Sequence, residues 1–424
     1  MTVSRAVRAI GVLCLLGLWL ACGDYYRPVA NPIIPNPPNP GASHIALVVT
    51  GNGVNDPGAS TTIDVSGDVA TSQATVGLVP VHAALVQKGT LVYVANSHDD
   101  TVSAFGPSTP LPVTTISLPS GSLPSFVATT ESATVYVANS GSNTIAAIST
   151  FNNVLTNTIP VGVNPVTMAE LPNGQKLYVA NKGNGTGNGS VSSINTIDQI
   201  PNPPISGTWI SPVWVAVRSD GQRAYVLDSG TGNVSAIDTS SDAVINNAPV
   251  GVGADFMLYD PNLDRLYVTN PAGNQLLVLD ASSDTLTATP VTIANAITVA
   301  ALPDGTRVYV SSAGVTASAS GSTVTSQVTV LDATDLSVKT TIPLTTVKLA
   351  PGCTAKAWSE LFMAAAADST RVYVGNCDAG NTAIIQTSND TLLTQIASPV
   401  SAQKPATNGG TPPPQNPVFV LAGP

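Results

Sequence analysis

Charged side chains are scarce in this sequence: Asp, Glu, Lys and Arg make up 9% of its 424 residues, and aromatic residues make up 5%. Gly and Pro are abundant, at 35 and 34 residues. Such a chain has few of the residues that build solvated helices, so the composition indicates β-sheet with many turns. The formal net charge of −10 argues against nucleic-acid binding, because phosphate recognition needs a basic face.

Histidine and cysteine are also rare. The histidines are His44, His82 and His98, and there are four cysteines. No spacing suggests a Ser-His-Asp site, and no Cys-x-x-Cys pair suggests a zinc, redox or haem-attachment site. The cluster His98-Asp99-Asp100 has metal-binding residue types without the spacing of a known site, so it reads as a solvated loop. We therefore predict no catalytic residue, no metal and no cofactor.

What the sequence does contain is a repeat centred on a tyrosine. Apolar runs such as residues 265–270, Arg-Leu-Tyr-Val-Thr-Asn, are apolar on both faces, which favours a strand buried on both sides. Successive tyrosines lie about 42 residues apart, the length of one four-stranded propeller blade, with a longer final interval. The tyrosines are Tyr93, Tyr136, Tyr178, Tyr225, Tyr267, Tyr309 and Tyr373.

Each repeat predicts four strands. An apolar first strand, such as residues 297–302, leads through a Pro-Asp-Gly turn into the tyrosine strand. An Asn/Gly/Ser loop, a third strand such as residues 275–280 and a more polar fourth strand such as residues 154–159 follow. A β-sandwich or solenoid built from the same strands is the alternative.

Residues 267–270 spell Tyr-Val-Thr-Asn, and residues 93–96, 136–139 and 178–181 spell Tyr-Val-Ala-Asn. The chain in this respect resembles the YVTN family of β-propeller repeats over residues 45–424. The resemblance implies an all-β fold with a single β-propeller. It leaves function open, because similar blades occur in envelope and surface-layer proteins and in lactonase-like propellers.

The first propeller segment is out of phase with the repeat. Residues 45–50, 61–65 and 74–79 align with second, third and fourth strands, and the missing first strand appears at residues 416–421. We predict a ring closed by a mixed blade of three N-terminal strands and one C-terminal strand, which removes exposed edges. Eight four-stranded blades over residues 44–424 are favoured. Seven is the alternative, with the terminal segments paired outside the ring.

The N-terminus reads as a targeting segment. Arg5 and Arg8 precede an apolar run at residues 10–20 that is short for a membrane span. Leu20-Ala21-Cys22 looks like a bacterial lipobox, although Trp19 stands where Leu is usual. We predict a signal peptide at residues 1–21, a lipidated Cys22 and a Pro-rich tether at 22–43; ordinary secretion with cleavage after Ala21 is the alternative. Gly23 after the cysteine favours the outer membrane, on its periplasmic or surface side.

Two cysteines remain after cleavage, Cys353 and Cys377, in one repeat. The predicted compartment is oxidising, so we predict a disulfide that pins the loop around residues 347–358.

Loop lengths give the sharpest functional signal. Connections from first to second and third to fourth strand are tight, whereas the long ones join second to third strands or lead into the next blade. In a propeller these long connections share one face, and binding residues tend to lie on such loops. The alternative is that they are neutral insertions. The long connections are residues 51–60, 182–190, 198–211, 312–326, 346–359 and 398–416. The candidate binding residues on this face are His98, Asp99, Asp100, Lys182, Trp209, Lys348, Lys356, Trp358 and Asp378.

Polar residues also end nearly every tyrosine strand. They either ring the mouth of the central channel or satisfy turn backbone groups, and the second role is favoured. These residues are Asn96, Asn139, Asn181, Asp228, Asn270 and Asn376.

The sequence thus predicts a lipid-anchored cell-envelope propeller that acts as a binding or scaffolding module. Its partners would be the membrane, through the lipid, and an envelope protein, a glycan or a small ligand. The alternative is a lactonase-like hydrolase of a small cyclic ester, which the scarcity of histidine disfavours.

Overall fold

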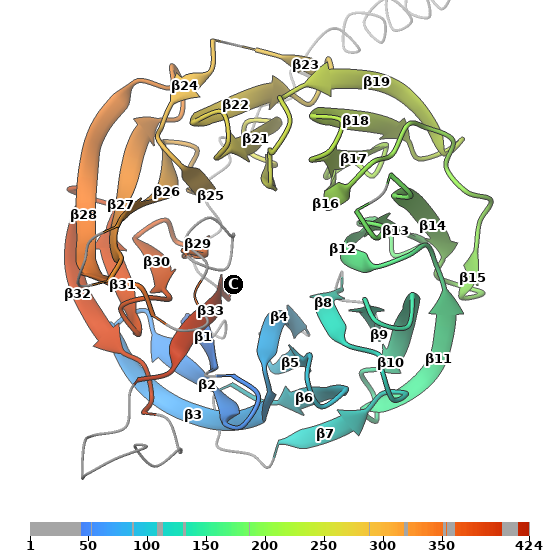
Figure 1. Ribbon diagram of the computed structural model, residues 1–424, viewed down its shortest axis with the longest axis horizontal. Coiled ribbons are helices and arrows are strands. Elements are labelled where there is room, and N and C mark those ends of the chain that lie inside the picture. Colours follow the sequence, from blue (N-terminus) through green and yellow to red (C-terminus); the bar gives the residue numbers. More distant parts are fainter. Residues whose placement is uncertain are drawn as a thin grey trace, which may run out of the picture. The chain divides into compact units, whose positions relative to one another are not determined.

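A computed structural model describes residues 44–51, 53–86, 89–107, 113–129, 133–185, 187–287, 289–317, 321–350, 353, 361–400 and 414–423. These residues form strands and turns, arranged as eight antiparallel sheets around one axis (Figure 1). The fold is a β-propeller, and the prediction of eight four-stranded blades is confirmed. Cys22, the predicted signal peptide and the tether lie outside the described residues.

Blades are numbered along the chain, and strands within each blade are given from the axis outward. Blade 1 consists of β33 (Asn416–Ala422), β1 (Ile45–Gly51), β2 (Pro57–Asp64) and β3 (Val69–Leu78). Blade 2 consists of β4 (Pro80–Val86), β5 (Leu91–Asn96), β6 (Thr101–Phe105) and β7 (Thr114–Ser117). Blade 3 consists of β8 (Pro124–Ala128), β9 (Thr134–Asn139), β10 (Thr144–Ser149) and β11 (Val154–Pro160). Blade 4 consists of β12 (Pro165–Glu170), β13 (Lys176–Asn181), β14 (Ser190–Asn195) and β15 (Ile200–Pro201).

The second half of the ring repeats the same order. Blade 5 consists of β16 (Pro212–Val217), β17 (Arg223–Asp228), β18 (Asn233–Asp238) and β19 (Ala243–Pro249). Blade 6 consists of β20 (Phe256–Asp260), β21 (Arg265–Asn270), β22 (Gln275–Asp280) and an outer strand split into β23 (Thr285–Leu286) and β24 (Val291–Thr292). Blade 7 consists of β25 (Ala296–Ala301), β26 (Arg307–Thr316), β27 (Thr323–Asp332) and β28 (Val338–Lys348). Blade 8 consists of β29 (Met363–Ala365), β30 (Arg371–Asn376), β31 (Asn381–Gln386) and β32 (Thr391–Ala397).

The tyrosine strands are buried on both faces, as their apolar pattern predicts. All seven repeat tyrosines rank among the largest fully buried side chains. Each blade is covered by a blade on either side, so a second strand alternating Tyr and Val without polar partners is removed from water on both faces. This burial supplies the main apolar contact between blades.

Five of the seven buried tyrosines also make a polar contact with the next blade through their hydroxyls. Tyr178 donates to Asp242 (2.5 Å), and Tyr309 donates to Asp390 (2.6 Å), each acceptor lying in the third-to-fourth-strand turn of the next blade. Both Asp residues have left-handed backbone, with φ of 56° and 54°, a conformation that Asp tolerates better than most residues. Basic residues two positions before these tyrosines pair with the same carboxylates.

The ring is closed in blade 1 as predicted. The strand β33 pairs antiparallel with β1, with partners from Ala46↔Ala422 to Gly51↔Asn416 (Figure 1). The side chain of Gln415 adds a hydrogen bond to the Pro57 carbonyl (2.9 Å). Both ends of the described propeller are thereby held in one sheet, and β33 covers the edge that β1 would otherwise leave unpaired.

The two faces of the ring differ. The face with the second-to-third-strand loops and the blade-to-blade connections is called the loop face, and the other the turn face. Connections of blades 4, 7 and 8 on the loop face are long, as at residues 202–211 and 398–415. Residues 312–326 are a correction: they were predicted as a loop, but β26 and β27 extend through most of this range as a hairpin rich in Thr, Val and Ser, residues that mostly suit a pleated strand.

Candidate ligand site at the axis of the ring

The innermost strands share one local geometry at their loop-face ends. In β4, β8, β12, β16 and β33 a proline near the start is followed by an irregularity in pairing two residues later. A proline is tolerated at a strand start, and the bulge re-aims the residue between proline and the resumed ladder. The residues at this bulge position, or its equivalent in the other blades, are Val81, Ser125, Val166, Val213, Asp255, Ile297, Leu361 and Val418.

The next residue of each innermost strand forms a layer of side chains around the axis. Six of the eight are aromatic, and each contacts the next around the ring. Their centroids lie 3.7 Å apart for His82–Phe126, 6.1 Å for Phe126–Trp214, 4.6 Å for Trp214–Phe256, 5.8 Å for Phe256–Phe362, 4.3 Å for Phe362–Phe419 and 4.0 Å for Phe419–His82. This aromatic layer lies around the axis of the ring, with pairs that range from stacked to edge-to-face.

Threonines occupy the two remaining places in the aromatic layer. Thr167 donates to the Val213 carbonyl (3.0 Å), and Thr298 donates to the Leu361 carbonyl (2.6 Å). Each hydroxyl therefore ties one innermost strand to that of the next blade. Burial lowers the pKa of His82 to about 3, so this member of the layer is a neutral ring at physiological pH.

A cavity of about 250 Å³ lies on the loop-face side of this layer. Its wall is built from bulge-position residues of blades 2–6, and Thr167 of the aromatic layer lines it as well. Two residues that directly follow tyrosine strands, Ser97 and Lys182, complete the lining. The full set is Val81, Ser97, Ser125, Val166, Thr167, Lys182, Val213 and Asp255.

Asp255 and Lys182 give this cavity both signs of charge. Asp255 is half-buried, and desolvation raises its pKa, while the positive charge of Lys182 acts in the opposite direction. Among the described residues, no hydrogen bond or ion pair joins either side-chain charge to a protein group. The carboxylate is therefore partly stripped of water without a compensating protein donor, which is unfavourable unless a ligand or solvent supplies one.

A larger cavity of about 540 Å³ lies on the turn face, between blades 4 and 5. Its charged residues are Lys176 and Asp242, which form an ion pair of 2.9 Å, and Asp242 also accepts a hydrogen bond from the Tyr178 hydroxyl. These groups are already engaged in joining the blades. The axial cavity, with its free charges, is the better candidate for a ligand site.

Of the predicted binding residues, Lys182 is the one that lines the axial cavity. The two carboxylates of the 98–100 cluster accept hydrogen bonds from backbone amides. Asp99 accepts from the Leu78 amide (2.9 Å), and Asp100 accepts from the Gly121 and Leu123 amides (2.7 and 2.8 Å). His98 is exposed beside them. Within the described ranges, no group of three or more His, Cys, Asp or Glu residues is placed to hold a metal ion.

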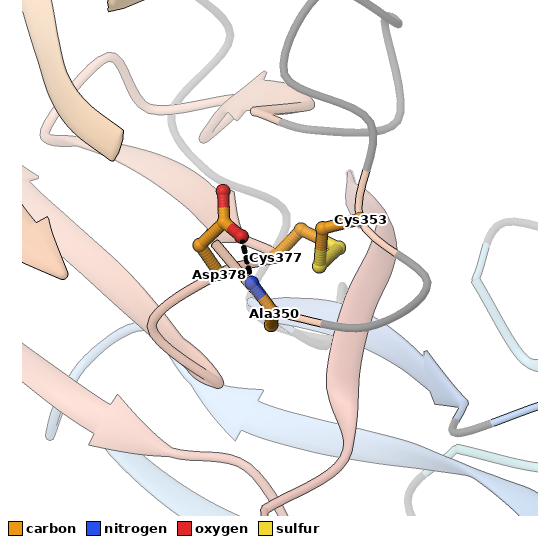
Figure 2. The surroundings of a disulfide bond; sticks show 4 residues. All are labelled: Ala350, Cys353, Cys377 and Asp378. Atoms are coloured by element: carbon orange, nitrogen blue, oxygen red, sulfur yellow. Dashed lines mark hydrogen bonds between the residues drawn. A yellow bond between two sulfur atoms is a disulfide. The ribbon is translucent and has the colours of Figure 1, made fainter. Parts of the chain in front are cut away.

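The structure places Asp378 and the cysteines together in blade 8. A disulfide joins Cys353 and Cys377, whose Cα atoms lie 5.8 Å apart, and Asp378 accepts a hydrogen bond from the Ala350 amide at 2.6 Å (Figure 2). Both contacts fasten the connection that leads towards Phe362 of the aromatic layer. Lys348 is exposed at the end of β28. Lys356 and Trp358 lie outside the described residues.

The remaining sequence candidates are structural. Trp209 is 8% exposed, and its indole N–H donates to the Ile205 carbonyl (3.1 Å), so it packs between blades and offers no exposed anchor. The polar residues that end the tyrosine strands are buried and bond to protein groups of two kinds. Asp228 accepts from the Ile210 and Ser211 amides (2.7 and 2.9 Å). Asn96 donates to the hydroxyl of Ser103 (3.0 Å), and Asn376 donates to the hydroxyl of Ser326 in blade 7 (3.1 Å). They do not line the axial cavity.

Sequence reasoning missed Asp255 and the aromatic layer. The signal was present, because Pro-x-aromatic triplets begin several innermost strands, as in Pro124-Ser125-Phe126 and Pro212-Val213-Trp214. Asp255 lacks the proline and follows Gly253 and Ala254, so it resembles an ordinary loop residue.

No family model matches the chain, and no curated protein matches it. Solved structures do. NirN, a dihydro-heme d1 dehydrogenase in complex with DHE, is 12% identical over 89% of this chain and 75% of its own, with a TM-score of 0.61. Apo AztD from Citrobacter koseri is 11% identical over 89% and 97%, with a TM-score of 0.61. A functionally unknown protein from Desulfotomaculum acetoxidans is 13% identical over 84% and 96%, with a TM-score of 0.53. At these identities the likeness shows the fold alone: the chain is a β-propeller.

The described residues hold no helix of sufficient length and apolarity to cross a membrane.

Proposed function

We propose that the chain is a lipid-anchored cell-envelope propeller that binds a small ligand at the axial cavity on its loop face. The observation that carries the proposal is the cavity of about 250 Å³ in which Asp255 and Lys182 present unpaired charges above the aromatic layer. A concave, mostly apolar site with a few convergent polar groups is the usual form of a small-molecule site. Of the candidate binding residues predicted from the sequence, the proposed site keeps Lys182 and adds Asp255.

The test is capture of ligand by the full-length protein. Ser97→Trp fills the mouth of the cavity, and Ser140→Trp places the same bulk at the equivalent position of blade 3, outside the cavity lining. We expect small molecules from an envelope extract to be enriched on wild type and Ser140→Trp and lost from Ser97→Trp, as measured by mass spectrometry. Equal capture by all three proteins, or capture of a protein partner alone, overturns the axial site.

The cellular address rests on Leu20-Ala21-Cys22 and the apolar run before it. Cells expressing the protein with a labelled fatty acid should incorporate the label into wild type and not into Cys22→Ser. The Cys22→Ser protein should also leave the membrane fraction, because two or three acyl chains give the stable anchoring that one chain does not. Unlabelled wild-type protein in the soluble fraction would establish ordinary secretion instead.

A second candidate function is hydrolysis of a small cyclic ester. The observation that favours it is the raised pKa of Asp255 in a cavity shared with a lysine, since a carboxylate with raised pKa is suited to general-base chemistry. His82, at 6% exposure in the aromatic layer and outside the cavity lining, has no role in this reaction. Initial rates on a panel of lactones decide the question: turnover by wild type that is lost in Asp255→Asn establishes the enzyme, and no turnover above buffer excludes it for that panel.

A further inference from the structure

The eight blades provide eight equivalent positions at each level around the axis, and at two of these levels one residue departs from the common pattern. The first level consists of the residues that directly follow the tyrosine strands or their equivalent. These are Gly51, Ser97, Ser140, Lys182, Ser229, Pro271, Ala313 and Cys377. Lys182 is the one charged residue among them.

The second level consists of the bulge-position residues of the innermost strands. Four of them are Val or Ser residues in the cavity wall, and Asp255 is the one charged member. The three that lie outside the lining are Ile297, Leu361 and Val418. Each level therefore carries a single charge, of opposite sign to the other. Although they belong to blades 4 and 6, both charges line the same cavity.

The blade frame does not require either charge. The backbone amide of Asp255 donates to the Thr269 carbonyl (3.1 Å), and that of Lys182 donates to the Asn164 carbonyl (2.8 Å), but these bonds belong to the main chain and would be made by any residue other than proline. The side chains contribute no hydrogen bond or ion pair to a described residue. Other charged residues near this rim, such as Asp99 and Asp100, cap backbone amides instead. Lys182 and Asp255 are thus separated charges with unused binding capacity.

The rest of the cavity carries no charge, and the cavity is small. Val81, Val166 and Val213 supply three aliphatic walls, and Ser97 and Ser125 supply hydroxyls. At about 30 Å³ per water in the liquid, the cavity holds only about eight water-sized groups, which suits a ligand of amino-acid size. A ligand with an ammonium and a carboxylate could neutralise both protein charges at once. A ligand with only one charge leaves the other protein charge desolvated and unpaired.

We infer that the axial cavity binds a small zwitterion with a short aliphatic body, of the aliphatic amino-acid class, with its ammonium group towards Asp255 and its carboxylate towards Lys182. This inference rests on the proposed function and specifies the ligand of the same site. The valine walls receive the aliphatic body, and the aromatic layer limits how deeply the ligand enters.

The experiment uses three ligands that share one carbon skeleton. Valine carries both charges, isobutylamine lacks its carboxylate, and isovalerate lacks its ammonium group. The full-length protein is first screened by thermal shift against the aliphatic amino acids. Titration calorimetry then compares valine, isobutylamine and isovalerate. If another amino acid gives the larger thermal shift, that amino acid and its own amine and carboxylate analogues are compared instead. We expect the zwitterion to bind at least about tenfold more tightly than either analogue, because each charged contact contributes a charge-assisted interaction.

Variants assign each charge to its partner. Asp255→Asn should weaken binding of the zwitterion and leave binding of isovalerate nearly unchanged. Lys182→Met should weaken binding of the zwitterion and leave binding of isobutylamine nearly unchanged. Lys348→Met is the matched control, since it removes an exposed lysine of the same face that does not line the cavity.

The outcomes separate this inference from the proposed function. Equal affinity for the amino acid and one analogue overturns the inference that the ligand is a zwitterion, and indicates a site for a ligand with a single charge. If no aliphatic amino acid gives a thermal shift but a ligand from the extract is still lost in Ser97→Trp, the zwitterion inference is overturned and the axial site is retained. No response and no such extract ligand overturn both.

Discussion

Arg371 and Asp68 form an ion pair across the last junction of the ring, with Nη2 and Oδ2 2.9 Å apart although the two residues are 303 positions apart in the chain. The guanidinium Nε also donates to both carboxylate oxygens at 3.0 Å. Arg371 begins the tyrosine strand of blade 8, and Asp68 lies in the turn of the mixed blade 1. The pair therefore repeats, at the closure, the inter-blade contact that Arg307 makes with Asp390.

Replacing Asp68 by Asn tests what this pair contributes. Asn accepts the left-handed backbone at residue 68, where φ is 51°, so the change removes the charge without adding strain. We expect the free energy of unfolding to fall by about 1–2 kcal/mol, the contribution of a charge-assisted hydrogen bond in a mostly buried setting. Chemical denaturation measures it. The control is Lys339→Met, which removes the 3.5 Å pair with Asp332 at the surface and should have a much smaller effect.

Variants of two tyrosines distinguish the contribution of the hydroxyl to stability from the contribution of the ring. Tyr309→Phe removes the 2.6 Å hydrogen bond to Asp390 and should cost about 1–2 kcal/mol. Tyr373→Phe removes a buried hydroxyl with no hydrogen-bond partner in the described structure, so it should be neutral or stabilising. Thermal and denaturant unfolding of both variants test this, and equal losses would show that the hydroxyl contact is not what distinguishes the two junctions.

Removing the Cys353–Cys377 disulfide should destabilise the connection into blade 8. The two residues are separated by 24 positions, and for a loop of this size the chain-entropy model gives about 3.5 kcal/mol. We expect the Cys353→Ser, Cys377→Ser double variant to unfold at lower temperature and to exchange amide hydrogens faster around Phe362. Unchanged exchange there, with a lowered melting temperature, would mean that the disulfide acts on the unfolded chain alone.

Asp255→Asn should stabilise the protein at neutral pH. The pKa of Asp255 is raised by desolvation, so in the wild type the ionised form is disfavoured by folding. Stability is highest below the ordinary carboxyl pKa and is lost as pH rises through the raised pKa of the folded state. Melting temperatures of the two proteins should converge near pH 3 and diverge by pH 7, with the variant higher. A wild type that is the more stable at pH 7 would contradict this and indicate a direct contact between Asp255 and Lys182.

The fold was predictable because the sequence pattern of each repeat predicts the same four-stranded blade independently of the others. The tyrosine strands carry the same two-sided apolar pattern, and the out-of-phase ends, residues 45–50 and 416–421, leave one place for a closing strand. Errors were confined to places where local pattern is ambiguous. Residues 312–326 are polar enough for a loop, yet their alternation also suits the extended hairpin that they form.

The candidate site was less predictable because its residues come from different repeats. Lys182 was selected as one charged residue among several after tyrosine strands, and Asp255 was not selected. Sequence cannot distinguish Asp100, which caps two backbone amides, from Asp255, which caps none, since the donors come from segments distant in the chain. The distinction depends on which loops the ring brings together.

Closure by β33 also orders the events of biosynthesis. The innermost strand of blade 1 is the last strand of the propeller to be made, whereas its partner β1 is the first. Until residues 416–422 are delivered, β1 has an unpaired edge, and the junction between blades 8 and 1 lacks a neighbour that contacts both. Such an open intermediate can pair with another copy of itself. A chain that ends before β33 should thus aggregate or be degraded in the cell, even though seven of its blades are complete.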